Sequence, residues 1–447
     1  MIEIDKKVKK VRRDILKVIW QSILLSHPDN TIKNHLKLHY NSLTIDNNKI
    51  NLDAYDNIYV IGAGKASAHM AKAIENIFMR RITGGLICVK YGHGIKLHNI
   101  LLAEAGHPVP DENSYSAAKK TLEIVQKCTH KDLIICLMSG GASSIWALPY
   151  AKIPFTDKQR CYEVLLGSGA DIHEINTVRK HISRIKGGRL AQAAHSARLI
   201  TLAISDVIGD DFSSIGSGPS TGDPTTFKDA MDVFTKYNLT QKIPKSIFEH
   251  TIAGLKGEIK ETPKPNDRIF RGNIECIIAS NKQFLEIAKQ TGENLGYNAK
   301  IVSNELSGEA SEVGKQIIEN ARKIRIAKKS GYKPTMLLFG GETTVTLKGD
   351  GKGGRNQELT LSAALEMTDL KDVVIASMGT DGTDGPTDAA GAFADTTTIA
   401  RGNDIRLNAK EFLDRNNSYG YFDRLGDLIK TGPTGTNVMD IQAVIIY

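Results

Sequence analysis

Polar and charged residues follow apolar segments of strand length at five places in this sequence, where they could bind or transfer an anionic group. The segment 199–204 runs directly into Ser205 and Asp206, and then into a loop rich in Gly, Ser and Pro. Similar segments end at four further positions, Gly62, Ser139, Gly340 and Gly379. Because open α/β sheets bind ligands outside the carboxyl ends of their strands, this repeated position predicts a site lined by loops. A single aspartate after a strand would more often cap a turn, so the prediction depends on the repetition.

The loop after the first of these segments has the composition of an anion-binding turn. Gly62, Gly64 and Ser67 are spaced like the small residues of a dinucleotide fingerprint, in which backbone N–H groups approach an anion at a helix N-terminus. The acidic residue that would bind a ribose is missing, because the next strand ends at Lys90. The loop is not of the Walker A type either, since other residues occupy the first Gly position and the Ser/Thr position of that motif. Lys65 therefore lies at a helix start outside both motifs, and a surface lysine is the alternative.

Two further segments of the first half could bind phosphate or carboxylate groups. The loop 139–144 places small residues and hydroxyl groups at a predicted helix start, a position that favours anions. The residues assigned to this loop site are Ser139, Gly140, Gly141, Ser143 and Ser144. In the helical segment that follows, Asn176, Arg179 and Lys186 belong to a polar set at three- and four-residue spacings, so several members share one face. Glycines that pack helices and a solvated cationic face are the alternatives.

The second half of the sequence has a candidate loop of its own at 349–358, where glycine and aspartate residues precede an arginine. Arg355 lies at a predicted helix start, from which its planar guanidinium could bind phosphate oxygens through two hydrogen bonds. The neighbouring residues assigned to ligand binding are Glu342, Gly353, Gly354 and Asn356.

Acidic residues gather in the loop after the predicted strand 372–378. Asp381 and Asp384 belong to a set of three carboxylates within eight residues, and oxygen ligands of this kind suit Mg²⁺. The loop lacks the Gly-x5-Glu end of an EF-hand, and turns closed by aspartate side chains are the alternative. A lysine, an arginine, several carboxylates and glycine loops, without a Cys or His nucleophile, together indicate phosphoryl transfer. That chemistry depends on positioning and charge neutralisation.

Strands and helices alternate with short glycine-rich junctions along the chain, which predicts an α/β fold with a mostly parallel sheet covered on both faces. A chain of 447 residues exceeds one ordinary core, so we expect two domains. The composition becomes polar and proline-rich between about 255 and 272, and we place the boundary there. The prediction is an N-terminal domain over 1–262, a C-terminal domain over 270–447, and an active site in the cleft between them.

The composition excludes several classes of partner. The formal charge of +8 is modest, and no basic motif alternates with aromatic residues, so nucleic-acid binding is not expected. A positive balance does suit an anionic substrate. No apolar run approaches the ~20 residues of a membrane span, so no membrane partner is expected either. Five cysteines without CxxC spacing indicate reduced thiols in a cytoplasmic protein. The oligomeric state stays open, a homo-oligomer included.

Many of the basic residues lie in the first part of the chain, on a predicted helix. Its apolar stripe consists of Val8, Val11, Ile15, Val18 and Ile19. A solvated cationic face is favoured there over an acidic partner.

The motifs together resemble a known enzyme family. The stretches VIGAGKAS, AGHPVPDENS, LMSGGASS, HEINTVRKHISRIKGGRLA, ISDVIGDDFSSIGSGP, LFGGETTVTLKGDGKGGRNQEL and GTDGTDGPTDAAGA follow one another in the order of the glycerate kinases that phosphorylate the 2-hydroxyl, whose C-terminal domain is called MOFRL. The resemblance runs from about residue 15 to the end of the chain. It implies a Rossmann-like N-terminal domain, a smaller α/β C-terminal domain, and an ATP- and Mg²⁺-dependent kinase that makes 2-phosphoglycerate from D-glycerate.

The resemblance also assigns roles to individual residues. The lysine of GAGK falls on Lys65 and the arginine of GGRNQE on Arg355, and both would bind phosphate or the substrate carboxylate. Asp206 would either accept the proton of the 2-hydroxyl or hold Mg²⁺. Some relatives carry the label hydroxypyruvate reductase, so an oxidoreductase is one alternative. Two features weigh against it: the acid that would bind a ribose is missing, and Ser67 departs from the GxGxxG pattern of dinucleotide-binding loops. A non-catalytic sensor of sugar acids is the other alternative.

Overall fold

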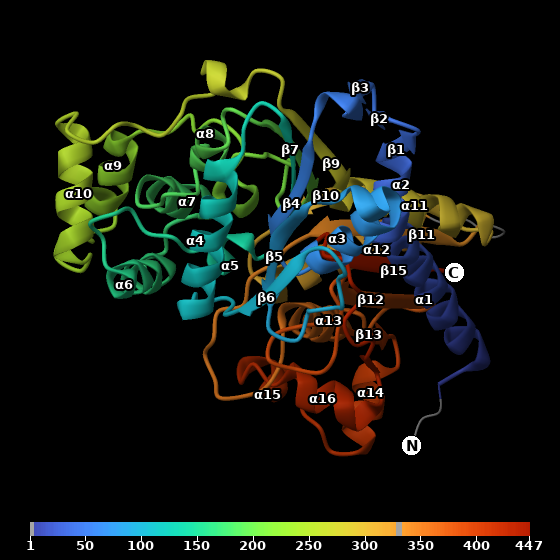
Figure 1. Cartoon of the computed structure of the whole chain (residues 1–447). Helices are drawn as coiled ribbons and strands as arrows, with labels where there is room; N and C mark the ends of the chain where they lie inside the picture. Colours follow the sequence, from blue (N-terminus) through green and yellow to red (C-terminus); the bar gives the residue numbers. More distant parts are fainter. Residues whose placement is uncertain (1–3, 328–332) are drawn as a thin grey trace. The chain divides into compact units, whose positions relative to one another are not determined.

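Apolar segments bounded by glycines and short polar loops form two six-stranded sheets in the described residues, 4–327 and 333–447, of this computed structural model (Figure 1). The chain divides into two compact units. The central unit consists of residues 28–278, and the terminal unit combines residues 1–27 with residues 279–447.

The sheet of the central unit has the strand order of a dinucleotide-binding fold. Its strands are β4 (Asn57–Ala63), β5 (Gly84–Lys90), β6 (Leu101–Ala105), β7 (Asp132–Met138), β8 (Arg198–Ile204) and β9 (Ile274–Ala279). They are arranged as β6-β5-β4-β7-β8-β9, and the pairs from β6 to β8 are parallel. The first strand of this sheet in the sequence therefore lies beside the fourth, as in Rossmann folds. All residues of β7 are buried, as expected for a central parallel strand.

The helices of the central unit cover this sheet and extend beyond it. They are α2 (Pro28–His35), α3 (Ser67–Phe78), α4 (Glu112–Lys127), α5 (Ala142–Ile145), α6 (Phe155–Leu166), α7 (Ile172–His181), α8 (Arg189–Ala193), α9 (Phe227–Lys236) and α10 (Lys245–Leu255). Figure 1 shows α6, α7, α9 and α10 grouped to one side of the sheet, and residues of these helices share a separate hydrophobic core. A small antiparallel sheet of β1 (Leu36–His39), β2 (Ser42–Ile45) and β3 (Asn48–Asn51) follows α2.

The terminal unit contains a mixed sheet. Its strands are β10 (Asn298–Leu306), β11 (Thr335–Gly341), β12 (Val373–Gly379), β13 (Gly391–Asp395), β14 (Leu428–Ile429) and β15 (Asp440–Ile446). They are arranged as β10-β11-β15-β12-β13-β14, and only the β10–β11 pair is parallel among these described strands. The helices are α1 (Lys6–Ser26), α11 (Asn281–Asn294), α12 (Ala310–Ala327), α13 (Arg355–Glu366), α14 (Thr398–Asp404), α15 (Ala409–Asp414) and α16 (Ser418–Leu425). The predicted α/β class with a mostly parallel first sheet is confirmed.

The division of the chain differs from the predicted domains at both ends of the N-terminal domain. The strand β9, which was expected to begin the second domain, is instead the last strand of the first sheet. The central unit consequently ends at residue 278, and the proline-rich crossing before β9 is part of it. A local shift in composition marks a surface crossing, but it does not show to which sheet the next strand adds.

The helix α1 belongs to the terminal unit, although it comes first in the chain. Its predicted apolar stripe is buried, and the helix packs on α11. Arg12 was expected on a solvated face, but its Nη1 lies 2.6 Å from Oδ1 of Asp427 and its Nη2 lies 2.5 Å from Oδ2 of Asp395. Both carboxylates are fully buried, so these ion pairs hold α1 against residues that lie 383 and 415 positions later in the chain.

Candidate functional site

The loops after β4 and β7 contact each other where the strand order of the first sheet reverses. The backbone N–H of Lys65 donates to the carbonyl of Gly140 at 2.8 Å, and the N–H of Ala66 donates to Oγ of Ser139 at 3.0 Å. Oγ of Ser67 lies 3.1 Å from Oγ of Ser139. This reversal is the topological switch point at which open α/β sheets bind ligands. The structure thus brings together two of the loops that the sequence singled out.

Glycine is required where these two loops meet. Gly64 has a φ of +134°, and a Cβ placed on it would lie 2.2 Å from Oγ of Ser139. A Cβ on Gly62 would lie 2.3 Å from the carbonyl oxygen of Leu137 in β7. The predicted glycines of the first loop therefore serve the close approach of two chain segments, and the amide groups that follow them are already bonded to the β7 loop.

The unused backbone donors lie on the second loop instead. Within the residues that the structure describes, the N–H groups of Gly140, Gly141 and Ser143 donate to no protein acceptor. The Ser144 hydroxyl donates to the Gly141 carbonyl at 3.1 Å, which closes the turn. The loop 139–144 is consequently the better candidate for binding an anion through backbone N–H groups.

Three predicted residues of the first half meet beside this loop. Oγ of Ser143 lies 2.9 Å from Oγ of Ser217, which in turn donates to Oδ1 of Asn176 at 3.0 Å. Nζ of Lys186 donates to the carbonyl of Gly216 at 3.2 Å. The loop after β8 thus joins α7 to the β7 loop. Residues 216 and 217 were missed by the sequence reasoning, although they belong to the small-residue stretch after β8.

Asp206 lies two residues after the end of β8 and is half-buried. Its position at the carboxyl end of a strand agrees with the prediction. The β7–β8 pairing brings the end of β8 next to the end of β7, from which the loop 139–144 begins.

Three buried cations lie on α6, on α7 near Asn176, and in the segment after α7. Lys158 and Lys186 are completely buried, and Arg179 is 8% exposed. Nζ of Lys158 donates to the carbonyl of Ile182 at 3.3 Å, and the Arg179 guanidinium lies 4.7 Å from the centre of the Tyr162 ring. Among the described residues, none of these three cations has a carboxylate within 4.0 Å. We call Lys158, Arg179 and Lys186 the unpaired cation cluster.

Burial without a counter-charge changes the protonation of the cluster. Burial, and then the charge of Arg179, lowers the pKa of Lys158 to about 7. Burial, with the charges of Lys158 and Arg179, holds the pKa of Lys186 well below its usual range. A buried cation without a partner is costly, so an anionic ligand would stabilise this cluster strongly. Sequence reasoning missed Lys158, although it lies in a buried helical stripe with Cys161, Tyr162 and Leu165, where a lysine is unusual.

The cations of the predicted polar face of α7 differ in their partners. Nζ of Lys180 lies 3.2 Å from Oδ1 of Asp223, and Asp223 also accepts a hydrogen bond of 2.9 Å from Thr262. Lys180 is therefore neutralised by a carboxylate of its own unit. Arg179, one residue earlier, belongs to the unpaired cation cluster.

In the terminal unit, Arg355 begins α13 as predicted, and carboxylates hold its guanidinium. Nε and Nη2 lie 2.6 and 2.8 Å from the two oxygens of Asp440, and Nη1 lies 2.8 Å from Oε1 of Glu342. Asp440 is the first residue of β15, where it pairs with Gly341 of β11 and Gly379 of β12. Burial alone would lower the pKa of Arg355, but the two hydrogen bonds and the charge of Asp440 outweigh it and raise the pKa. Sequence reasoning missed Asp440, because nothing local marks it.

The carboxylate of Asp384 caps the start of α13. Its oxygens accept the N–H groups of Asn356 and Gln357 at 3.1 and 2.9 Å, and the Gln357 side chain at 2.9 Å. Burial raises the pKa of Asp384 to about 6, although these hydrogen bonds oppose the shift. This position uses the affinity of a helix N-terminus for negative charge. A metal ion on Asp384 would have to replace this cap.

The other predicted residues of the terminal unit support the same loops. Oδ1 of Asp381 accepts the N–H of Thr383 at 3.0 Å, as in an aspartate-closed turn. Oδ1 of Asn356 accepts a hydrogen bond of 2.5 Å from Ser377. A Cβ on Gly353 would lie 2.4 Å from Oγ of Ser418, and one on Gly354 would lie 2.4 Å from Cγ of Asp384. These glycines permit close packing around the start of α13.

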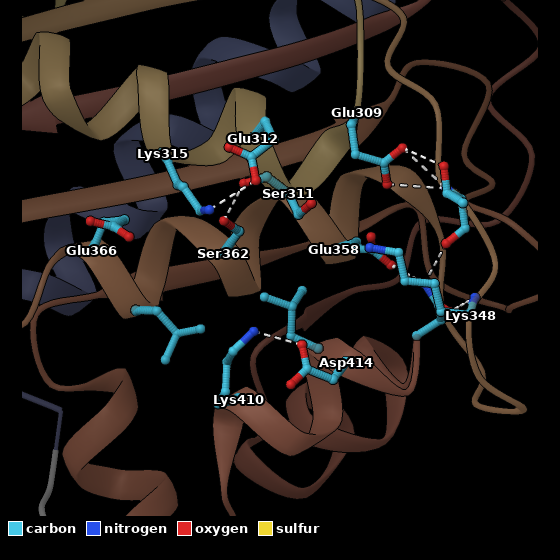
Figure 2. A pocket seen from close by; sticks show the side chains of 14 residues that line it. Glu309, Ser311, Glu312, Lys315, Lys348, Glu358, Ser362, Glu366, Lys410 and Asp414 are labelled. Atoms are coloured by element: carbon cyan, nitrogen blue, oxygen red, sulfur yellow. Dashed lines mark hydrogen bonds and ion pairs between the residues drawn. The ribbon is translucent and has the colours of Figure 1, made fainter.

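Two cavities of the terminal unit adjoin this region. One of about 600 Å³ is lined by Glu342, Arg355 and the loop 349–354. The other, of about 360 Å³, lies among α12, α13 and α15 (Figure 2). In Figure 2, Lys315 points at Glu312 and Lys410 points at Asp414, at 2.8 and 2.6 Å. Because acidic residues already pair with its lysines, the second cavity is a poor place for an anion, and the first is the better candidate.

Comparison with known proteins identifies both halves of the chain. Residues 14–251 match a domain of unknown function (DUF4147), and residues 335–440 match the MOFRL family. The chain is 40% identical to a glycerate 2-kinase of Pyrococcus horikoshii, over 98% of this chain and 97% of that protein. It is 41% identical to a putative hydroxypyruvate reductase of Agrobacterium vitis, over 87% of this chain and 86% of that protein. The crystal structure of a glycerate kinase from Thermotoga maritima is similar with a TM-score of 0.83 and 35% identity, over 98% of this chain and 100% of that one.

Among the helices that the structure describes, none has the length and apolar character needed to cross a membrane.

Proposed function

We propose a specific reaction for this chain, which belongs to the glycerate 2-kinase family. The reaction is transfer of the γ-phosphoryl group of ATP to the 2-hydroxyl of D-glycerate, giving 2-phosphoglycerate and ADP. The observation that carries the proposal is the unpaired cation cluster, whose Lys186 donates to the loop after β8, next to Ser217, which bonds to Ser143 of the loop 139–144. A reaction between two anionic substrates needs such positive charge.

The proposed chemistry assigns a task to each group. The 2-hydroxyl oxygen forms a bond to phosphorus while the bond from phosphorus to the β-phosphate oxygen breaks, and the hydroxyl proton moves to a carboxylate. Asp206 at the end of β8 is our candidate for that carboxylate. Lys65 of the central unit or Arg355 of the terminal unit would neutralise the charge that develops on the transferred group. The backbone donors of the loop 139–144 would bind phosphate oxygens of the nucleotide.

Arg355 is suited to this task because its orientation is fixed before substrate arrives. Two of its nitrogens are held by a carboxylate with no exposed side-chain surface, Asp440, while Nη1 bonds to the 44% exposed Glu342. The outer contact can exchange for a phosphate oxygen, while the inner one holds the plane of the guanidinium. A preorganised cation of this kind costs little reorganisation in the transition state.

Mg²⁺ is the metal that this reaction would use, and it neutralises charge on the phosphates when bound. Carboxylate oxygens are its usual protein ligands, which Asp206 and Asp381 offer. Asp384 fits less well, because both of its oxygens accept hydrogen bonds from the start of α13. We therefore propose that Asp206 of the central unit or Asp381 of the terminal unit would hold the ion, with Asp206 as the alternative proton acceptor.

An oxidoreductase is the rival reaction, since a relative carries the name of a putative hydroxypyruvate reductase and the first sheet has the Rossmann order. Two observations weigh against it. The strand β5 ends in Lys90 rather than in an acid for a ribose hydroxyl. The N–H groups of Lys65 and Ala66 are bonded to the β7 loop and are not available to a pyrophosphate.

The test is turnover of D-glycerate with Mg-ATP, followed by ³¹P NMR of the product. The proposal predicts a resonance of 2-phosphoglycerate and no oxidation of NADH or NADPH with hydroxypyruvate. Asp206→Asn should lower kcat by at least ~10²-fold if Asp206 accepts the proton. A product phosphorylated at the 3-position would overturn the regiochemistry, and reduced-nucleotide oxidation without phosphoryl transfer would overturn the kinase assignment.

A further inference from the structure

A histidine, an aspartate and a cysteine meet in the central unit at a place that the proposed reaction does not use. His35 is the last residue of α2, Asp46 lies in the turn between β2 and β3, and Cys276 lies in β9. Nδ1 of His35 is 2.7 Å from Oδ1 of Asp46. Sγ of Cys276 is 3.1 Å from Oδ2 of Asp46 and 3.7 Å from Nδ1 of His35. Within residues 4–327 and 333–447, this is the one group of three such side chains whose ligand atoms all lie within 4.8 Å of one another.

We propose that His35, Asp46 and Cys276 bind one zinc-type divalent cation. A tetrahedral zinc ion, with bonds of about 2.3 Å to sulfur and about 2.0 Å to nitrogen and oxygen, needs these ligand atoms roughly 3.3–3.6 Å apart. The separation of 3.7 Å between Sγ of Cys276 and Nδ1 of His35 is close to that range, whereas the 2.7 and 3.1 Å separations run to different oxygens of Asp46. Rotation of this carboxylate and shifts of about half an ångström would complete the geometry. A sulfur ligand with an imidazole selects zinc, cobalt or copper over Mg²⁺ or Ca²⁺.

The charges of the three groups also suit a dipositive ion. Asp46 supplies the carboxylate, which contacts both of the other groups: its Oδ1 lies beside Nδ1 of His35 and its Oδ2 accepts from the Cys276 thiol. Cys276 binds as a thiolate after its Sγ–H proton leaves to solvent, and His35 binds as neutral imidazole. Two negative ligands then balance the two positive charges of the ion. A neutral cluster is the favourable composition for a half-buried site.

The backbone fixes these ligands before any ion binds. The N–H of Asp46 donates to the carbonyl of His35 at 2.9 Å, which holds the turn against the end of α2. Asp46 has a φ of +47°, so the turn has a left-handed residue at the ligand position. Cys276 is 5% exposed, whereas the side chains of His35 and Asp46 are 24% and 48% exposed. The site is therefore open on one side, where water would be the fourth ligand.

An ion at this position would join three separate elements of the central unit. It would connect the end of α2 and the turn of the small antiparallel sheet to β9, the last strand of the first sheet. Since the ligands are brought together only in the folded chain, binding stabilises the fold. The site lies outside the residues proposed for catalysis, so occupancy should act on stability rather than on turnover.

The experiment is titration of chelator-treated full-length protein with Co²⁺ and with Zn²⁺. We expect one ion per chain, a sulfur-to-cobalt charge-transfer band with Co²⁺, and a rise in Tm of roughly 5–10 °C at a hundredfold excess of Zn²⁺ over its Kd. Mg²⁺ should give neither the band nor the shift.

Variants identify the ligands. Cys276→Ser should abolish the charge-transfer band, and His35→Gln should weaken Zn²⁺ binding at least tenfold. The matched controls are Cys128→Ser, whose thiol donates to a helix carbonyl, and His39→Gln, an exposed histidine of the neighbouring strand; both should bind as wild type. No band in wild type, or an unchanged band in Cys276→Ser, would overturn the proposal. Because the readouts are spectra and Tm, either result is independent of whether the chain phosphorylates glycerate.

Discussion

In the terminal unit, Arg12 and Arg355 bond to carboxylates that are completely buried, whereas in the central unit Lys158 and Lys186 have only carbonyl oxygens as hydrogen-bond acceptors among the described residues. In the terminal unit, the fold itself supplies the carboxylates that neutralise the two arginines. The described residues of the central unit supply no counter-charge for Lys158 and Lys186, and burial lowers their pKa values, so a bound anion is needed to keep these lysines charged. Both regions contain cations that the sequence suggested for anion binding, yet only the charge of the second requires an anion from outside.

The difference separates two ways in which a protein can use buried charge. Asp440 fixes the plane of Arg355, so this arginine is positioned whether or not ligand is present. The unpaired cation cluster is destabilising without a ligand, and an anion that binds there gains the energy of its neutralisation. Substitutions should therefore have opposite effects on stability in the two regions, while both lower activity.

The largest loss of stability and activity should come from breaking the ion pair between Asp440 and Arg355. Asp440→Asn removes the charge that holds Arg355, so we expect a loss of about 3 kcal/mol in the free energy of unfolding and a fall in kcat/KM of at least ~10²-fold. Urea denaturation and steady-state kinetics measure the two effects. Asp414→Asn is the matched control, because Asp414 is an exposed partner of Lys410 and should cost less than ~0.5 kcal/mol. A loss in Asp440→Asn no larger than in this control would contradict the role of Asp440.

Lys186→Met should give the opposite result for stability. Replacing a buried lysine that lacks a counter-charge by an apolar side chain of similar length should stabilise the ligand-free protein by roughly 1–3 kcal/mol. The same change removes a cation from the cluster, so KM for one of the two anionic substrates should rise at least tenfold. Thermal unfolding without ligand and kinetics with each substrate varied in turn measure both. A destabilised variant with unchanged KM would show that Lys186 is a structural residue.

The pH dependence of stability should distinguish Lys158 from an ordinary lysine. The folded pKa is about 7 against 10.5 for the free side chain, so the unfolded chain binds more protons between these values. Stability of the ligand-free protein should therefore rise with pH across this window and be lost as pH falls toward 7. Lys158→Met should reduce the slope by up to about 1 kcal/mol per pH unit, whereas Lys242→Met, at an exposed lysine, should leave it unchanged. Parallel curves for wild type and Lys158→Met would contradict the assignment.

The smallest expected effect is on the pH dependence of stability, and it comes from Asp384, the buried cap of α13. Its folded pKa of about 6 exceeds the usual 3.8, so its contribution to stability is present below pH 4 and is lost as pH rises through about 6. Asp384→Asn keeps an acceptor for the helix N–H groups and removes the titration. Urea denaturation between about pH 4 and 7 should show a stability difference between wild type and variant that changes with that sign. A difference that is constant with pH would mean that Asp384 is not buried as an acid.

Much of this molecule could be predicted from local patterns. Apolar segments that end in glycine loops predicted the strands of the first sheet, and Arg355 was expected at a helix start because glycines precede it. The partners of these residues could not be predicted in the same way. Asp440 lies 85 residues after Arg355, and the pairing of β15 between β11 and β12 brings it there. Lys158 was not singled out, because the second layer of helices that buries it is not visible in the sequence.

The long-range contacts also decided the division of the chain. Arg12 was one of many basic residues in the first helix, and its pairing with Asp427 depends on residues more than 400 positions away. Similarly, β9 followed a proline-rich crossing that suggests a boundary, yet it adds to the sheet that precedes it. Local composition identifies elements, whereas membership in a unit depends on pairings between distant segments.

The most direct test of the unpaired cation cluster is a calorimetric titration at about pH 8 with D-glycerate and, separately, with Mg-ADP, in buffers of low and high ionisation enthalpy. An anion bound at the cluster should restore the proton of Lys158, whose pKa is about 7 in the free protein. We therefore expect one of the two ligands to bind with uptake of a fraction of a proton approaching one. In Lys158→Met the uptake should be absent and the affinity lower. Tight binding of both ligands without proton uptake, and with equal affinity in the variant, would show that the cluster does not bind the substrate.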